Sequence, residues 1–199
     1  FLHEELYCRI SQNIDAVRSF NHLRDAADRD SLSGMYNRSY LLKSGSKLFE
    51  NAKRQNIRLM AVMIDIDQFK QITKDHGRQT GDRAVQHIAA KFDRLLRKTD
   101  LVSRFSHSEF CLLCVNAEAE HDQQQLLNNL RDVIQYSPLH DSDTLSIPLT
   151  ISIGYCTETA DSLEEMIDHA YTALQKAQQQ GRNQIAWHDP FKDENIIAS

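Results

Sequence analysis

The chain of 199 residues is poor in residues that break or cross-link structure, with three prolines, six glycines and four cysteines. So few prolines and glycines leave little room for a long disordered linker. Hydrophobic residues make up 41% of the chain and charged residues 26%, which is ordinary for one well-filled globular core.

Long hydrophobic runs and an excess of positive charge are also missing. Apolar runs such as 59–64 are far too short to cross a bilayer, and no signal-peptide pattern is present. The net charge of −5 and the pI near 6.0 argue against nucleic-acid binding, which usually requires a basic surface. We therefore expect a cytoplasmic domain. Because the chain begins at Phe1, we also expect it to be part of a longer protein with a sensor or membrane domain upstream.

Two of the cysteines, Cys111 and Cys114, have the spacing of a metal or redox motif. They lie in an apolar run typical of a strand, where residues three apart point to opposite faces. The pair is therefore interpreted as two buried thiols, which suits a reducing compartment.

The hydrophobic pattern predicts alternating helices and strands. Apolar spacings of three and four residues predict helices over 1–27, 38–55, 68–74, 80–97, 118–136 and 162–180, with a loop at 77–81. Apolar runs predict strands over 58–66, 101–105, 110–115, 145–157 and 185–187, the fourth of them interrupted by Pro148. The helix over 1–27 either forms a two-stranded coiled coil that joins this domain to an upstream sensor, or packs on its own domain.

Five different short motifs lie at separate places along the chain. They are Asp30–Arg38 near the start, Asp65–Lys70, Gly81-Asp82, Arg104–Phe110 and Gly181–Asn183 near the end. In order and spacing they resemble the GGDEF domain of diguanylate cyclases, which join two GTP molecules into cyclic di-GMP. The resemblance runs from about Asp28 to His188, but the signature reads Ser106, His107, Ser108, Glu109, Phe110 instead of Gly-Gly-Asp-Glu-Phe.

The resemblance implies an α+β fold related to nucleotide-cyclase and polymerase palm domains. We expect a mostly antiparallel five-stranded sheet flanked by helices, preceded by an N-terminal helix. The implied division is a linker or signalling helix over 1–27, a GGDEF-like domain over 28–190 and a tail over 191–199.

Forming cyclic di-GMP requires divalent cations, whose oxygen ligands must converge at strand ends. Asp65 matches the family's metal-binding aspartate, with the carbonyl of Ile66 as its companion, unless the carboxylate merely caps the next helix. Asp67 is interpreted as structural. The second metal carboxylate of the family is replaced by Ser108, a neutral hydroxyl, although Glu109 remains.

Other nucleotide contacts are altered as well. The family's glycines let the turn approach the ligand, whereas Ser106 and His107 add side chains there. The remaining positions of the GTP site carry Thr73, Asp82, Gln178 and Arg182. The family has asparagine in place of Thr73 and lysine in place of Gln178, so the resemblance implies a remnant site.

Arg97 and Asp100 stand at the family's product-inhibition site, spelled Arg-x-x-Asp. An aspartate accepts hydrogen bonds from a guanine edge, and an arginine grips a guanine acceptor or a phosphate. The alternative is local, with Arg97 at a helix end and Asp100 fixing the turn.

The sequence therefore predicts a catalytically inactive GGDEF domain that binds cyclic di-GMP, or that acts as a dimerising relay through its N-terminal helix. No cofactor is required, and Mg²⁺ matters only if residual GTP binding persists. The alternatives are an active cyclase with unusual site residues, a GTP sensor, and a protein-interaction module that binds no nucleotide.

Overall fold

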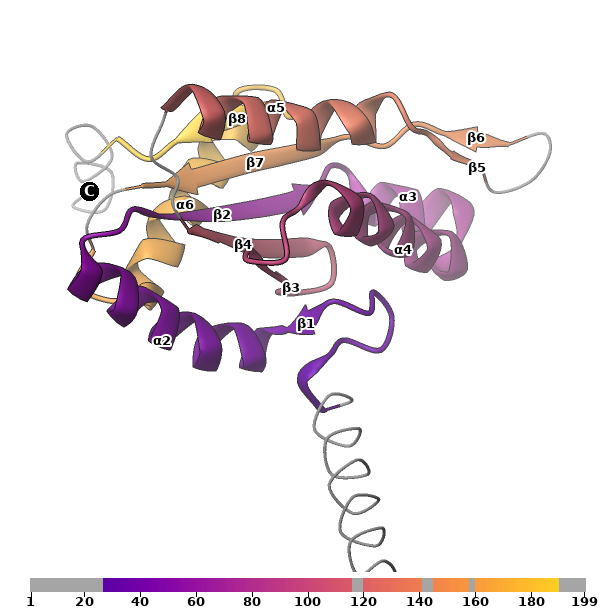
Figure 1. Ribbon diagram of the computed structural model, residues 1–199. Coiled ribbons are helices and arrows are strands. Elements are labelled where there is room, and N and C mark those ends of the chain that lie inside the picture. Colours follow the sequence, from indigo (N-terminus) through magenta and orange to yellow (C-terminus); the bar gives the residue numbers. More distant parts are fainter. Residues whose placement is uncertain (1–26, 116–119, 141–144, 158–159, 190–199) are drawn as a thin grey trace, which may run out of the picture.

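The computed structural model describes residues 27–115, 120–140, 145–157 and 160–189, whose framework is a sheet with helices on both faces (Figure 1). The predicted N-terminal helix lies outside the described residues except at residue 27, and so does the predicted tail. Among the described helices, none combines the length and the apolar character needed to cross a membrane.

Six strands form the main sheet of the described chain, in the order β1–β3–β4–β2–β7–β8. Their bounds are β1 (Tyr36–Asn37), β2 (Leu59–Ile66), β3 (Leu101–Arg104), β4 (Glu109–Val115), β7 (Ile151–Cys156) and β8 (Ile185–Trp187). The four inner strands are antiparallel, whereas β1 and β8 pair in parallel at the edges. The sheet thus has six strands instead of the expected five, because the short β1 adds to β3.

The strand predicted over 145–157 is divided in the structure. Its first part, β6 (Ser146–Ile147), pairs with β5 (Leu139–His140) in a separate ribbon, while its second part is β7. The two parts are separated by residues that include Pro148, which lacks the backbone donor that a continuous ladder needs. The expectation of one interrupted strand is corrected to two strands in different sheets.

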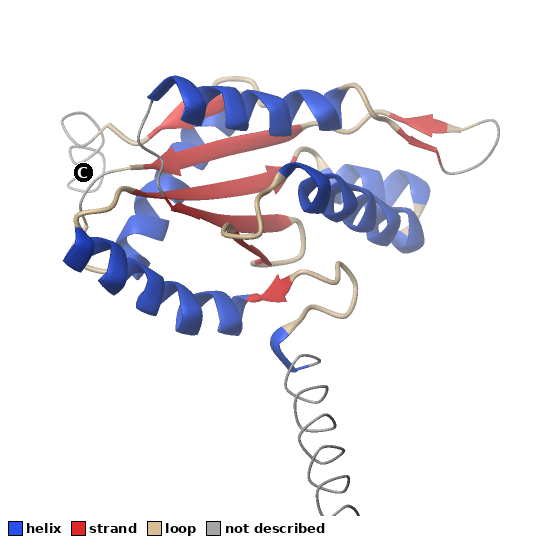
Figure 2. Ribbon diagram, in the orientation of Figure 1, coloured by secondary structure: helices blue, strands red, loops and turns tan. Residues whose placement is uncertain are grey.

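Five helices cover the sheet in the described chain (Figure 2). Their bounds are α2 (Arg38–Gln55), α3 (Phe69–His76), α4 (Arg78–Leu95), α5 (Glu120–Gln135) and α6 (Leu163–Gln179). One core cluster joins α4 and α5 to one face, and a second joins α2 and α6 to the other. Cys111 belongs to the second cluster and Cys114 to the first, which confirms that the two thiols point to opposite faces.

The predicted loop over 77–81 is wrong, because α4 already begins at Arg78. Gly77 is the single residue between α3 and α4, and its φ of 88° is the left-handed conformation that glycine adopts readily. Gly81 lies inside α4, where a Cβ atom would collide with the side chain of Thr73. The absence of that side chain lets the two helices pack closely.

Gly154 sets the closest approach between the sheet and a helix. A Cβ atom there would overlap backbone atoms of Ala170 and Leu174 in α6. We expect Gly154→Ala to lower the free energy of unfolding by at least about 3 kcal/mol, because backbone cannot yield as a side chain does. Urea unfolding followed by circular dichroism measures the loss.

Gly45→Ala provides the matched control. Its added Cβ would meet only side-chain ends of Leu113 and Leu163, at 2.8 Å, and alanine favours the helix. We expect a loss below about 1 kcal/mol. Equal losses for the two variants would contradict this account of how α6 packs on β7.

Candidate functional site

The turn between β3 and β4 carries the altered signature, and Arg104 holds its backbone. The guanidinium of Arg104 donates to the carbonyls of Ser106 (3.1 Å) and His107 (2.9 Å), and it pairs with the carboxylate of Asp30 at 3.1 Å. The Ser106 hydroxyl donates to Glu109 at 2.6 Å. The turn thus has its own internal network of hydrogen bonds.

The backbone of this turn tolerates the substituted side chains. Neither Ser106, His107 nor Ser108 has a positive φ, so none needs a glycine for its own conformation. The added side chains therefore affect a ligand that approaches the turn, and not the backbone of the turn itself. The side chains of Ser106 and His107 are exposed.

Asp65, at the end of β2, forms the centre of the site. Its Oδ1 accepts a hydrogen bond from the Ser108 hydroxyl at 2.6 Å, and its Oδ2 accepts one from the Gln178 amide at 2.7 Å. The backbone N–H of Ile66 donates to the carbonyl of Ser108 at 3.1 Å, which fixes the turn against β2. Both oxygens of the predicted metal ligand therefore already bind neutral donors from the same chain.

A second carboxylate lies beside that of Asp65 on the neighbouring strand, since Asp65 and Glu109 are directly opposed in the β2–β4 register. Burial raises the pKa of Asp65, the hydrogen bond from Ser108 opposes that shift, and the charges of Glu109 and Asp67 add to it. The pKa of the Tyr171 hydroxyl, from α6, is also raised, by burial and by the same two carboxylates, Glu109 and Asp65. Negative charge is thus concentrated where the two strands meet.

Asp67 has a structural role, as predicted. It is 5% exposed and accepts from the hydroxyls of Thr150 (2.8 Å) and Ser152 (2.6 Å) and from the backbone N–H of Asn183 (3.0 Å). It therefore ties β2 to β7 and to the turn after α6. The helix-cap alternative is not borne out, because α3 has Gln68 at its N-cap position, without a side-chain cap hydrogen bond.

The other predicted remnants of the GTP site lie outside this hydrogen-bonded cluster. Thr73, in α3, donates its hydroxyl back to the carbonyl of Lys70 at 2.9 Å. Asp82 lies partly buried in the first turns of α4. Arg182 is exposed, in a left-handed turn (φ 64°) after α6. Of the four remnants, the structure brings only Gln178 into contact with Asp65.

Arg97 and Asp100 form a compact turn before β3. The backbone N–H of Arg97 donates to the Asp100 carboxylate at 2.9 Å, and the backbone N–H of Asp100 donates to the carbonyl of Arg97 at 3.0 Å. Burial raises the pKa of Asp100. The side chain of Arg97 is exposed.

These two residues line a pocket of about 650 Å³ between the segment 29–36 and the end of α4. Its lining includes the cations Arg29, Arg97 and Lys98. Arg29 lies over the ring of Tyr36 at 4.7 Å, so an aromatic surface and a guanidinium meet there. Sequence reasoning did not identify Arg29, which is far from Arg97 along the chain.

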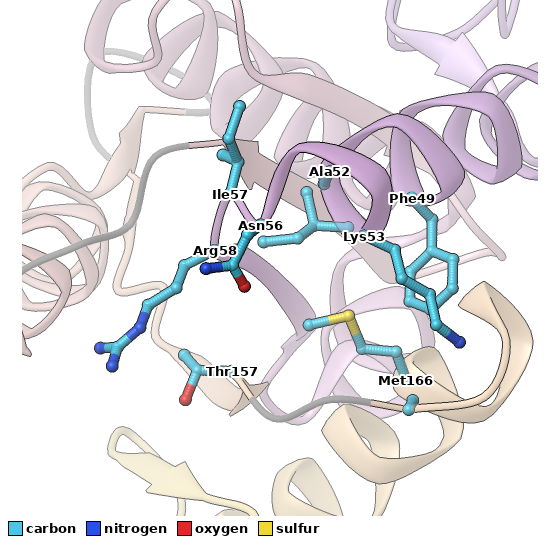
Figure 3. Close-up of a pocket in the computed structure, with 10 residues that line it drawn as sticks. Phe49, Ala52, Lys53, Asn56, Ile57, Arg58, Thr157 and Met166 are labelled. Carbon is cyan, nitrogen blue, oxygen red and sulfur yellow. The ribbon is translucent and has the colours of Figure 1, made fainter.

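A second hollow, of about 440 Å³, lies at the end of α2 and contains Phe49, Lys53 and Met166 (Figure 3). It shares no residue with the signature turn or with the pocket at Arg97.

The raised pKa of Asp65 predicts a dependence of stability on pH. A carboxyl whose pKa is higher in the folded state binds more protons there, so stability falls as pH rises above the ordinary value of 3.8. We expect Asp65→Asn to remove this decline and to raise the free energy of unfolding at pH 7. Urea unfolding between pH 4 and 7 measures it.

Asp67→Asn is the control, because one of the three donors to Asp67 is the backbone N–H of Asn183, which cannot turn to accept from an amide. Both donors to Asp65 are side chains that can accept as well as donate. We expect it to lower stability by about 1–3 kcal/mol. If Asp65→Asn instead lowered the free energy of unfolding, the hydrogen bonds to Asp65 would outweigh the cost of its burial, as expected for Asp67.

Comparisons with known proteins agree with this architecture. Residues 27–184 match the model of the family described as diguanylate cyclase, GGDEF domain. Diguanylate cyclase DgcP of Pseudomonas aeruginosa is 32% identical over 180 residues, which cover 88% of this chain and 26% of DgcP. The chain spans between 20% and 26% of the length of DgcP and two further curated relatives.

Two solved structures show the same fold. The coiled coil and GGDEF domain of DgcB from Caulobacter crescentus, in complex with c-di-GMP, is 21% identical with a TM-score of 0.85, covering 94% of this chain and 98% of that one. Diguanylate cyclase SiaD of Pseudomonas aeruginosa, in complex with its activator SiaC, is 28% identical with a TM-score of 0.79, covering 92% and 71%. The predicted α+β palm-like fold is confirmed, and the chain belongs to the GGDEF domain family of diguanylate cyclases.

Proposed function

We propose that this chain is a GGDEF domain without cyclase activity that binds cyclic di-GMP through Arg97 and Asp100. The carrying observation is at Asp65, whose two oxygens accept hydrogen bonds from the neutral side chains of Ser108 and Gln178. A site for two GTP molecules and their cations needs carboxylates free to bind metal. Here the carboxylate of Asp65 is satisfied from within the chain, and Glu109 accepts a hydrogen bond from the Ser106 hydroxyl.

The substitutions in the signature and at Gln178 also weaken catalysis. Ser108 supplies no charge to a divalent cation, and Gln178 supplies none to the nucleotide's terminal phosphates. Ser106 and His107 extend exposed side chains from the turn that the nucleotide would approach. Each lost factor of ten in rate corresponds to about 1.4 kcal/mol, so several weakened contacts together remove orders of magnitude. No cofactor is then required, and Mg²⁺ belongs only to residual GTP binding.

The pocket at Arg97 supports the receptor part of the proposal. It is lined by three cations and by two carboxylates, Asp93 and Asp100, which suits a ligand that has two phosphates and guanine edges. Arg97 has an exposed side chain, and the backbone contacts between Arg97 and Asp100 hold the turn in place. The structure of DgcB in complex with c-di-GMP makes this ligand the first to test.

The wider assembly is also a proposal. A homodimer through the N-terminal helix, beneath an upstream sensor or membrane domain in the cytoplasm, fits a domain that relays a signal without catalysis. The coiled coil of DgcB and the complex of SiaD with its activator SiaC support a relay that depends on partners.

An active cyclase is the second candidate, favoured by one observation. Asp65 and Glu109 remain opposed in register, so a cation that displaced Ser108 and Gln178 would find two carboxylates. Catalysis then depends on a rearrangement of the hydrogen bonds at Asp65.

Incubation with GTP and Mg²⁺ or Mn²⁺ distinguishes these candidates. We expect cyclic di-GMP formation at least about 1,000-fold slower than by DgcP, since a metal ligand and a phosphate contact are lost. Mass spectrometry measures the product. Product that disappears in Asp65→Ala would establish the cyclase and contradict the proposal.

Calorimetry with cyclic di-GMP tests the receptor. We expect saturable binding that weakens about 10- to 100-fold in Arg97→Ala, because a charged hydrogen bond contributes about 1.5–3 kcal/mol. Arg94→Ala, which changes an exposed arginine at the end of α4 outside the pocket, should bind like the parent. Absence of binding, or equal losses in both variants, would leave the ligand-independent interaction module.

A further inference from the structure

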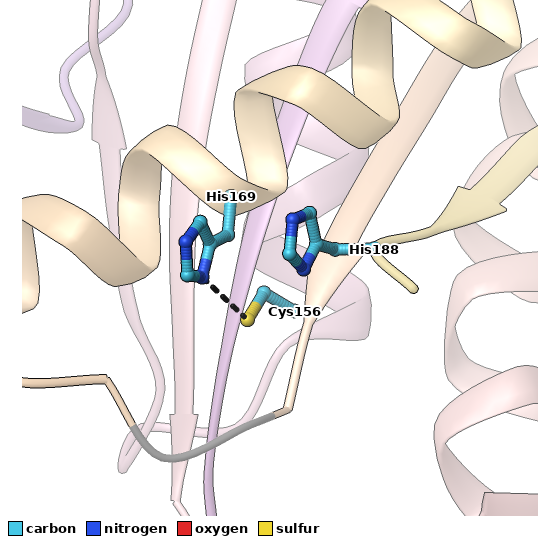
Figure 4. A group of neighbouring side chains, drawn as sticks. All are labelled: Cys156, His169 and His188. Atoms are coloured by element: carbon cyan, nitrogen blue, oxygen red, sulfur yellow. Dashed lines mark hydrogen bonds between the residues drawn. The ribbon is translucent and has the colours of Figure 1, made fainter. Parts of the chain in front are cut away.

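Three potential metal ligands meet at the end of β7, away from the signature. Cys156 ends β7, His169 projects from α6 and His188 follows β8, and their side chains converge in Figure 4. The sulfur and one ring nitrogen of each histidine all lie within 4.8 Å of one another. Three consecutive elements, β7, α6 and β8, thus supply one small cluster.

The contacts inside the cluster are close. Sγ of Cys156 lies 4.0 Å from Nδ1 of His169, and the two imidazole rings stack with centroids 4.1 Å apart and planes 4° from parallel. Thiolate and imidazole are the ligands that zinc binds most commonly in proteins. Nearly parallel rings do not direct their in-plane lone pairs to one point, so binding an ion requires one imidazole to rotate out of the stack.

We propose that Cys156, His169 and His188 form a zinc site in which water completes the tetrahedron. Zinc lies about 2.3 Å from sulfur and about 2.0–2.1 Å from nitrogen, which places tetrahedral ligands about 3.3–3.6 Å apart. Closing the cluster around an ion therefore requires movements of about 1 Å, within the reach of rotations of the side chains.

Burial favours a metal over thiol chemistry at this place. Cys156 is fully buried and His188 is 3% exposed, so a substrate cannot reach the sulfur as it would reach a nucleophile. His169 is partly exposed and leaves the cluster an entry path for an ion. The site would fasten β8 and α6 to the end of β7.

The location separates this site from the nucleotide chemistry. Ser152, near the start of β7, pairs with Asp65, whereas Cys156 at its other end pairs with Ala61. Zinc here acts on stability, so the inference stands whether or not the chain binds cyclic di-GMP.

Titration of the tag-free full chain with Zn²⁺ tests the site. We expect one ion per chain and a higher unfolding temperature, with no such effect of Mg²⁺, which prefers oxygen ligands. Cys156→Ser, His169→Gln and His188→Gln should each weaken zinc binding more than about 100-fold, because even changes to groups behind the ligands cost about 10- to 100-fold. His121→Gln, an exposed histidine on α5, should bind like the parent.

Co²⁺ provides a readout that a purely structural role would not produce. A cobalt–thiolate charge-transfer band should appear in the parent chain and should be lost in Cys156→Ser. Cys8→Ser, which removes a cysteine outside the cluster, is the matched control and should keep the band. Because His169 is partly exposed, His169→Gln keeps the test valid if the buried variants fail to fold. Unchanged zinc affinity in His169→Gln, or no binding by the parent, would overturn the proposal.

Discussion

The antiparallel pairing of β2 with β4 on one side and β7 on the other is the constraint on which the structure depends. This register places Asp65 opposite both Glu109 and Ser152, and it distributes the apolar residues of β2 between two helical layers. A shift of one residue would turn every side chain of the strand to the other face. The core and the site are therefore set by the same hydrogen bonds.

Asp65 and Asp67 show how one strand end separates two roles. Asp67 is buried and holds β7 and the turn at Asn183, whereas Asp65 faces the signature turn. In this chain Ser108 and Gln178 make Asp65 part of an internal hydrogen-bond network. The substituted signature thus leaves the framework intact, because the turn needs no glycine for its backbone conformation.

Much of the framework follows from the sequence. The sequence predicts β2, α2 and α6 closely. A strand buried on both faces gives a continuous apolar run, whereas a helix buried on one face has apolar residues every three to four positions. The interruption at Pro148 is predicted, but the two-residue β1 and the pairing of β6 with β5 are not, because each depends on a partner strand. Asp65, Ser108 and Gln178 follow from motif positions, but their mutual hydrogen bonds do not. Arg29 and the cluster at Cys156 depend on tertiary contacts between segments far apart.

The ion pair between Arg104 and Asp30 has a mechanical consequence. Asp30 lies near the beginning of the described chain, and the same guanidinium grips two carbonyls of the signature turn. A displacement at Asp30 therefore reaches the turn directly through the side chain of Arg104, beside the backbone pairing of β1 with β3. Arg104 thus couples the start of the described chain to the signature turn, so a force applied at Asp30 acts on the backbone of Ser106 and His107.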